Sequence, residues 1–262
     1  MSVLEKIVAQ KQQEVADRQR RYPYAELEKS FHWNRPPIRL TTALTAENSS
    51  GVIAEFKRRS PSKGVINDQV SIDQVSTGYV RAGAAALSIL TDTPFFGGHV
   101  EDLTRAREIN MVPILRKDFI ISEYQVMEAR SLGADVILLI ASVLGPAEVR
   151  RLGEFAVSLG MEVLLELHDP SEAGHICDPV QLVGVNNRNL SDFSVDVGRS
   201  LALARQLPTE KVWVAESGLQ DPAVVASLRT AGFRGFLIGE HFMRHANPEE
   251  ACSGFIRALR NA

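Results

Sequence analysis

The feature that most constrains the fold is a regular alternation of short apolar runs and amphipathic runs, which begins at Val52 and continues to the end of the chain. Eight runs have the length and composition of buried strands: 52–57, 85–91, 112–117, 135–140, 162–167, 181–186, 211–216 and 235–239. Runs with helical spacing follow them near 70–82, 99–109, 122–132, 146–159, 170–177, 196–206, 221–231 and 247–260. This alternation predicts parallel strands joined by helices.

Two architectures fit eight strand–helix units, a closed (β/α)8 barrel and a doubly wound open sheet. The strands recur in even steps, and none is followed by the G-x-G-x-x-G turn that typically marks a dinucleotide-binding sheet. We therefore predict an α/β protein whose residues 49–262 form a single (β/α)8 TIM barrel.

Residues 1–48 precede the first strand and follow a different pattern. Residues 1–21 have the spacing of an amphipathic helix, and Tyr22-Pro23 ends it; its buried face would carry Leu4, Ile7, Val8, Lys11 and Val15. We interpret residues 1–48 as an N-terminal helical extension that belongs to the same domain as the barrel.

The composition argues against several classes of partner and site. A net charge of −3 gives no electrostatic reason to expect nucleic acid or an anionic membrane as a partner. Cys177 and Cys252 lack metal-ligand spacing, and the N-terminus has no uninterrupted apolar core of a signal peptide. The longest apolar run, 136–144, is far shorter than the roughly 20 residues of a membrane helix. We expect a cytoplasmic protein.

Polar and charged residues stand at the ends of five of the eight predicted strands. In a TIM barrel the chemistry gathers at the carboxyl ends of the strands, so these side chains would meet at one rim. We predict that they form the catalytic set, which comprises Glu55, Lys57, Lys117, Glu166, Asn186, Arg188 and Glu216. We expect a lysine there to lose pKa beside another cation and a glutamate to gain pKa in a dry pocket, which would supply an acid and a base.

The first strand shows the pattern most clearly. Glu55 and Lys57 lie two residues apart and therefore face the same side of the strand, whereas Phe56 faces the other. A polar loop with Ser60, Pro61 and Gly64 follows at once. The segment is either one wall of an active site or a structural ion pair under an ordinary turn.

The last two strands carry a second signal. Ser217-Gly218 and Gly239-Glu240 follow them, and barrels often bind phosphate through the loops after these strands. Glycine at both places lets the main chain approach an anion closely, although glycine is also an ordinary turn residue. The loop 93–98 looks mobile and contains Phe96, which could pack on the rim.

Other motifs are weaker. His241 and His245 are one helical turn apart but lack the glutamate of the zinc-protease pattern, so we expect no metal. No nucleophile elbow and no phosphate loop ending in Gly-Lys-Ser/Thr is found. Phe119 follows the third strand and either fills the rim or lines a pocket for an aromatic group.

Over essentially its whole length, the chain resembles the indole-3-glycerol-phosphate synthase family of the tryptophan pathway. The matching motifs are IAEFKRRSPSKG, SILTD with FFGG, PILRKDFI, YQVMEARSLGAD, VLLELHD, GVNNRNL, AESG and FLIGEHFMR. The resemblance implies ring closure of 1-(2-carboxyphenylamino)-1-deoxyribulose 5-phosphate to indole-3-glycerol phosphate, with release of carbon dioxide and water. It implies no cofactor.

The resemblance also implies roles for individual residues. Lys117 would be the general acid for condensation and Glu166 the base for dehydration. Lys57 would hold the carboxylate or share the acid role, with Glu55 and Arg188 setting its charge state. Asn186 would position hydroxyl groups, and Glu216 would orient the network. The phosphate would lie on Ser60, Ser217, Gly218, Gly239 and the backbone N–H of Glu240, and the ring between Phe96, Phe119 and Leu190. Some members have serine at position 240.

The sequence leaves two rival functions. A phosphosugar isomerase would need an acid–base pair but no slot for a carboxylated ring, and an idle barrel that only binds a phosphometabolite would lack the charges at the rim. The partner we expect is a small phosphorylated substrate, and we expect the chain to be a monomer or a weak homodimer.

Overall fold

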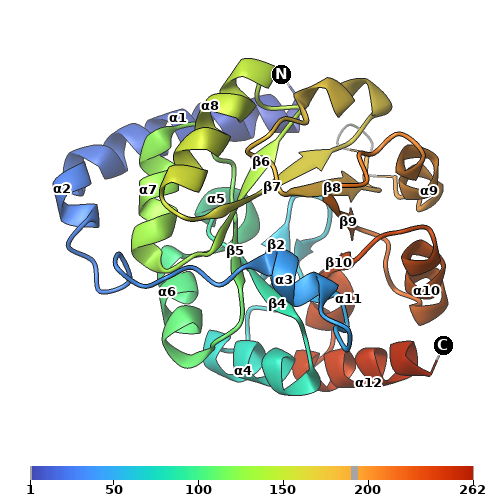
Figure 1. Cartoon of the computed structure of the whole chain (residues 1–262). Helices are drawn as coiled ribbons and strands as arrows, with labels where there is room; N and C mark the ends of the chain where they lie inside the picture. Colours follow the sequence, from blue (N-terminus) through green and yellow to red (C-terminus); the bar gives the residue numbers. More distant parts are fainter. Residues whose placement is uncertain (1, 190–193, 262) are drawn as a thin grey trace.

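The computed structural model describes residues 2–189 and 194–261, and it shows a closed barrel of eight parallel strands surrounded by helices (Figure 1). The strands are β1 (Val52–Phe56), β4 (Ala86–Leu90), β5 (Ile114–Lys117), β6 (Val136–Ile140), β7 (Glu162–Leu167), β8 (Leu182–Asn186), β9 (Val212–Glu216) and β10 (Gly235–Ile238). β10 pairs with β1 in parallel and closes the ring. The predicted TIM barrel is therefore confirmed.

The surrounding helices follow the predicted order. They are α4 (Ile72–Ala82), α6 (Val100–Ile109), α7 (Glu123–Leu132), α8 (Pro146–Ser158), α9 (Gly198–Ala204), α10 (Pro222–Thr230) and α12 (Pro248–Arg260). The prediction over 170–177 was wrong in type, because this segment forms a 3-10 helix, η1 (Pro170–His175). Gly174 weakens an α-helix there, and Pro179 disfavours helical backbone in the residue before it.

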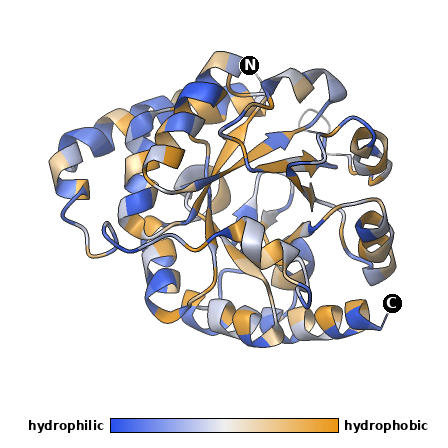
Figure 2. Cartoon of the chain, viewed as in Figure 1, coloured by the Kyte–Doolittle hydropathy of each residue, from blue (hydrophilic) through white to orange (hydrophobic). Residues whose placement is uncertain are grey.

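The core has two layers. Inside the barrel, strand residues such as Leu115, Leu164 and Val214 pack against one another, and outside it the opposite faces of the strands pack against the helices. Figure 2 shows the strands mostly in hydrophobic colours and the helices in alternating ones, as expected for strands buried on both faces.

The N-terminal residues form α1 (Val3–Arg21), α2 (Tyr24–Leu27) and α3 (Leu40–Thr45). α3 closes the amino-terminal end of the barrel, where Leu40 and Leu44 are buried against the interior layer. Glu162 at the start of β7 accepts the backbone N–H of Leu40 at 2.6 Å and that of Thr41 at 3.1 Å. These bonds fix the end of the barrel opposite to the predicted site.

α1 confirms the predicted amphipathic helix and is anchored by an unusual residue. The side chain of Lys11 is only 1% exposed, and its Nζ lies 2.9 Å from Glu14, 3.0 Å from Asp92 and 2.9 Å from Asp118. Asp92 follows β4 and Asp118 follows β5. A lysine on the apolar face of α1 therefore joins this helix to the carboxyl ends of two strands.

Three short elements were not predicted. They are a hairpin of β2 (Arg59–Ser60) with β3 (Gly64–Val65), and the one-turn helices α5 (Thr93–Phe96) and α11 (Glu240–Met243). The interpretation of 93–98 as a mobile-looking loop was wrong, because Asp92 caps α5 by accepting the N–H of Phe95 at 2.9 Å. In the part of the chain that the structure describes, no helix is long and apolar enough to cross a membrane.

Candidate active site

A single pocket at the carboxyl ends of the strands contains every predicted site residue that the structure describes. These residues are Glu55, Lys57, Ser60, Phe96, Lys117, Phe119, Glu166, Asn186, Arg188, Glu216, Ser217, Gly218, Gly239 and Glu240. Leu190, the remaining predicted residue, lies outside the described residues. The convergence on one rim, which the strand ends predicted, is therefore observed.

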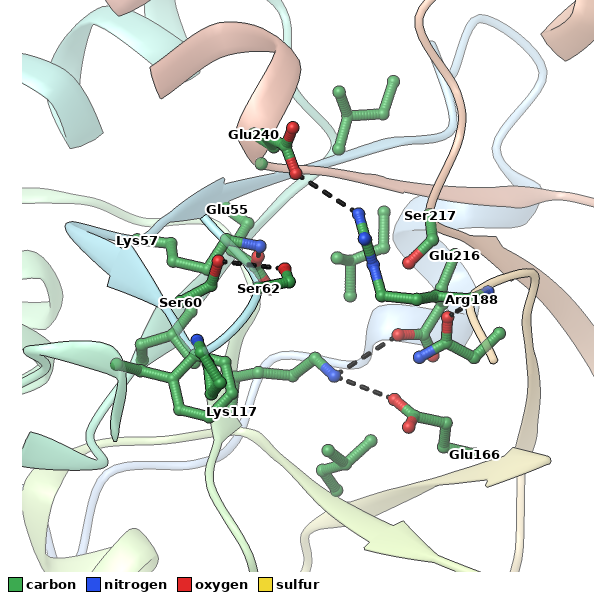
Figure 3. A pocket seen from close by; sticks show the side chains of 18 of the residues that line it. Glu55, Lys57, Ser60, Ser62, Lys117, Glu166, Arg188, Glu216, Ser217 and Glu240 are labelled. Carbon is green, nitrogen blue, oxygen red and sulfur yellow. Dashed lines mark hydrogen bonds and ion pairs between the residues drawn. The ribbon is translucent and has the colours of Figure 1, made fainter. Parts of the chain in front are cut away.

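Lys117 lies at the centre of the charged residues (Figure 3). It is the last residue of β5, and its Nζ is 2.8 Å from Glu166 Oε2 and 3.4 Å from Glu216 Oε2. The two carboxylates come from the ends of β7 and β9, so the lysine reaches across the barrel mouth. All three side chains are largely buried, which strengthens their mutual interaction.

The three groups do not titrate alike. For Lys117 burial disfavours the charged form, but the surrounding carboxylates outweigh it and raise the pKa of Lys117 above its ordinary value. For Glu166 burial favours the protonated form, but Lys117 and His168 hold the pKa of Glu166 well below its ordinary range. Burial raises the pKa of Glu216 to about 8, and the neighbouring Glu166 carboxylate contributes to this shift.

These directions correct two predictions. The prediction that a lysine pKa is lowered was wrong for Lys117, because the neighbours of Lys117 are carboxylates and not cations. The prediction that a glutamate pKa is raised was wrong for Glu166 and right for Glu216. Near neutral pH these directions correspond to a charged Lys117, an ionised Glu166 and a protonated Glu216.

Glu55 and Lys57 form a second ion pair on the same wall of the pocket. Lys57 Nζ lies 2.9 Å from Glu55 Oε1, and the hydroxyl of Ser88 donates to Glu55 Oε2 at 3.2 Å. A Cβ at Gly239 would lie only 2.5 Å from Glu55 Oε1. Glycine at position 239 therefore leaves room for the Glu55 carboxylate, which is a packing reason for this residue beside the predicted approach to phosphate.

The carboxylate of Glu216 also has room only because a neighbouring residue is glycine. A Cβ at Gly184, on the neighbouring strand β8, would lie 2.4 Å from Glu216 Oε1. Within the described residues this buried oxygen has no hydrogen-bond partner. An unpaired buried carboxylate oxygen favours the protonated form, which agrees with the raised pKa of Glu216.

The backbone after β9 is strained where the phosphate cradle was predicted. Ser217 has a φ of 65°, a left-handed value that is uncommon for a residue with a side chain, and Gly218 follows with 76°. The side-chain amide of Asn187 donates to the carbonyl of Ser217 at 3.2 Å, and its oxygen accepts the Ser200 hydroxyl at 2.7 Å. Asn187 therefore holds this turn, a role that the sequence did not reveal.

Arg188 and Glu240 form a further cation–carboxylate pair in the pocket lining. Arg188 Nη2 is 3.2 Å from Glu240 Oε2 (Figure 3). The more exposed Lys63 reaches within 3.9 Å of Glu240 Oε1. Glu240 begins α11, so its side chain faces two cations while its backbone N–H belongs to the first turn of the helix. Cationic groups are thus present beside the predicted phosphate site.

One side of the pocket is apolar. The rings of Phe96 on α5 and Phe119 after β5 lie 5.9 Å apart between centroids and are tilted by 38°. The first turns of α1 add Val3, Leu4 and Ile7 to the same lining. The pocket therefore combines a wall that suits an aromatic ring with charged groups that suit carboxylate and phosphate.

The described residues contain no group of three or more His, Cys, Asp or Glu side chains that could hold a metal ion. What the described pocket offers is a charged lysine, carboxylates in two protonation states and anion-binding groups. Proton transfer to and from a bound anionic substrate is the chemistry that this set supports.

Comparisons with known proteins show the family of the chain. The family model of indole-3-glycerol phosphate synthase matches residues 4–255. The chain is 46% identical over 258 residues to indole-3-glycerol phosphate synthase of Bacteroides thetaiotaomicron, which covers 98% of this chain and 99% of the relative. The enzyme of the same name from Acidithiobacillus ferrooxidans is 42% identical over 253 residues, with 95% and 96% covered.

Solved structures show the same fold at low identity. The tryptophan synthase α subunit of Legionella pneumophila superposes with a TM-score of 0.63 at 12% identity, covering 86% of this chain and 99% of that one. A chain described as native KDPGal gives a TM-score of 0.56 at 19% identity, with 80% and 92% covered. These two structural likenesses show the barrel fold alone. The sequence matches extend over the barrel and the N-terminal helices together. From these sequence matches, the chain belongs to the indole-3-glycerol phosphate synthase family.

Proposed function

We propose that the pocket carries out the family's reaction with a defined division of labour among its residues. The chain is a carboxy-lyase of tryptophan biosynthesis that converts 1-(2-carboxyphenylamino)-1-deoxyribulose 5-phosphate to indole-3-glycerol phosphate. Three steps need assistance: attack of the ring carbon on the ketone, loss of carbon dioxide and loss of water. The observation that carries the proposal is Lys117 held between Glu166 and Glu216.

Lys117 is the general acid in this proposal. It is charged in the free site, and it lies in the middle of the mouth, where it can donate a proton to the ketone oxygen as the ring carbon attacks. Binding of the substrate beside Lys117 would draw the ammonium away from Glu166. The acid therefore starts from a stable ion pair and becomes a donor only when substrate is bound.

Glu166 is the base for the later dehydration. Its lowered pKa keeps it ionised in the free site, so it can accept a proton without first losing one. Glu216 orients the network and, since its pKa is about 8, carries a proton near neutral pH. Asn186 positions the substrate's hydroxyl groups.

The anionic ends of the substrate have matching groups. Lys57, paired with Glu55, holds the carboxylate or shares the role of acid, and Arg188 adds positive charge. Ser60, Ser217, Gly218, Gly239 and the backbone N–H of Glu240 bind the phosphate. Phe96 and Phe119 hold the ring, with Leu190 as the third member of the sandwich.

Further properties are part of the same proposal. The buried contacts of Lys11 support a single domain in which residues 1–48 complete the barrel of 49–262. The free thiols of Cys177 and Cys252 suit a reducing cytoplasm. We propose a monomer or weak homodimer that uses no cofactor and binds neither nucleic acid nor membrane.

The test is a steady-state assay of the purified chain with the carboxyphenylamino substrate, followed by the ultraviolet absorbance of the new indole. We expect saturable turnover with release of carbon dioxide. Binding of phosphate analogues without turnover would instead support an idle barrel. Isomerisation of a phosphosugar without indole formation would support the isomerase alternative.

A further inference from the structure

His168 lies directly behind Glu166 and has no place in the reaction described above. It follows β7, two residues after Glu166, so both side chains point to the same side of the chain. The His168 side chain is buried, and its Nε2 lies 3.1 Å from Glu166 Oε1. Lys117 contacts the other oxygen, Oε2, at 2.8 Å. The two oxygens of Glu166 thus have one partner each.

The contacts of His168 define its tautomer. Nε2 lies close to Glu166 Oε1 but is not aligned for a hydrogen bond in this structure, so the contact is an electrostatic approach. Because an ionised carboxylate only accepts hydrogen bonds, the tautomer with the proton on Nε2 is the one that can complete a bond here. The other ring nitrogen, Nδ1, lies 3.4 Å from the hydroxyl of Ser142, which follows β6. In a neutral imidazole Nδ1 is then the acceptor and the Ser142 hydroxyl its donor. Ser142, His168, Glu166 and Lys117 form a chain of polar contacts.

The backbone of His168 is fixed as well. Its N–H donates to Glu172 Oε2 at 2.6 Å, and its carbonyl accepts from Arg199 Nη1 at 3.2 Å. The charged groups around the imidazole are therefore Glu166 on its own segment, Glu172 on η1, Arg199 on α9 and, beyond Glu166, Lys117 on β5. The backbone that carries the imidazole is thus held from η1 and α9, while the ring itself contacts Glu166 and Ser142.

In the proposed reaction Lys117 loses its positive charge when it donates its proton to the substrate. Once Lys117 has turned to the substrate and given up this proton, Glu166 loses the cation beside Oε2 while it remains buried, and a buried carboxylate without a cation takes up a proton more readily. A protonated Glu166 could not act as a base. The contact with His168 is independent of Lys117 and remains in place during this step.

We propose that His168 is a positioning residue, which holds Glu166 ionised and correctly oriented while Lys117 is engaged with the substrate. This inference rests on the proposed role of Glu166 as the base. It assigns to the Ser142–His168 pair a function in the reaction, although neither side chain needs to touch the substrate.

The test compares kcat, KM and the pH profile of kcat/KM for the wild type, His168→Ala and His168→Gln. A hydrogen bond to a charged group corresponds to about a ten- to hundred-fold change, so His168→Ala should lower kcat by this factor and leave KM within a few-fold. Loss of the donor raises the pKa of Glu166, so the acid limb of the profile should move to higher pH. The amide nitrogen of glutamine can take the place of Nε2, and His168→Gln should recover most of kcat.

Control variants separate positioning from packing. Asparagine mimics Nδ1 and does not reach Glu166, so His168→Asn should behave like His168→Ala; Ser142→Ala should give a smaller loss in the same direction. If His168→Ala does not fold, the glutamine–asparagine pair decides, and equal kcat in these two variants would overturn the inference. So would a lower melting temperature with unchanged kcat and acid limb. If the wild type forms no indole, the proposed function fails as well, which the same assay reveals separately.

Discussion

Replacement of Lys11 by methionine should destabilise the protein far more than loss of a surface charge does. Methionine keeps the apolar stem, but Asp92 and Asp118 then lose a cation that lies about 3 Å from each of them inside the protein. Removing one partner of a buried ion pair costs roughly 3–5 kcal/mol, because the other charge stays buried. Arg116 still pairs with Asp118 at 3.1 Å, so we expect the lower end of this range.

The measurement is thermal unfolding followed by circular dichroism. In a domain of this size 1 kcal/mol corresponds to about 2–4 °C, so Lys11→Met should lower Tm by roughly 10 °C. The matched control is Lys29→Met, because Lys29 in the N-terminal extension also forms an ion pair, with Glu26 at 2.6 Å, but its side chain is 69% exposed. We expect no measurable change in the control. Equal Tm values for the two variants would refute the argument from burial.

The pH dependence adds a second check. Lys11 and Arg116 hold the pKa of Asp118 below its ordinary value, although burial acts in the opposite direction. A carboxyl with a lowered folded-state pKa contributes stability above its ordinary pKa of 3.8, and this contribution is lost as pH falls through the folded-state value. The difference in Tm between wild type and Lys11→Met should therefore be full near pH 7 and become smaller in acid. A difference that grows below pH 4 would contradict this reasoning.

Three more predictions concern the pocket. Lys117→Ala should lower turnover by about 10²–10⁴-fold, the usual contribution of general acid catalysis, and unchanged kcat in the indole assay would remove Lys117 from the mechanism. For Glu216 the folded-state pKa of about 8 lies above the ordinary 4.5, so wild-type stability should fall as pH rises between these values. As pH rises from 4.5 to about 8, the Tm of Glu216→Gln should rise relative to the Tm of the wild type. A Tm difference that does not change with pH would show that Glu216 is ionised throughout. Gly184→Ala should lower both Tm and kcat because its Cβ would meet the Glu216 carboxylate, whereas Gly174→Ala, whose Cβ meets nothing within 4 Å, is the control; equal effects would rule out the clash.

The barrel and the position of its mouth could be predicted because they depend on local patterns. Apolar runs of strand length alternate with helical runs, and the polar or charged residues that end several of the strand runs, such as Lys117 and Glu216, mark the rim directly. The convergence of these residues follows from the closed ring of parallel strands. No long-range contact had to be guessed to reach that prediction.

The features that could not be predicted from the sequence depend on contacts between distant residues. Lys11 has an ordinary helical position, and only the fold shows that Asp92 and Asp118 surround it. The pKa directions were wrong for Lys117 and Glu166 because they depend on which charges become neighbours. The left-handed backbone of Ser217 has no sequence signature, since serine rarely adopts it. His168 stood in a matching motif, but its contact with Glu166 becomes visible only in three dimensions.

The most direct test of the central claim is a crystal structure with an unreactive substrate analogue in which a hydroxyl replaces the ketone. We predict that the phosphate lies on the backbone of Ser217, Gly218 and Gly239, that the ring packs on Phe96 and Phe119, and that Lys117 Nζ has left Glu166 for the new hydroxyl. An analogue bound outside this pocket, or bound within it with the ion pair of Lys117 and Glu166 intact at 2.8 Å, would contradict the proposed mechanism.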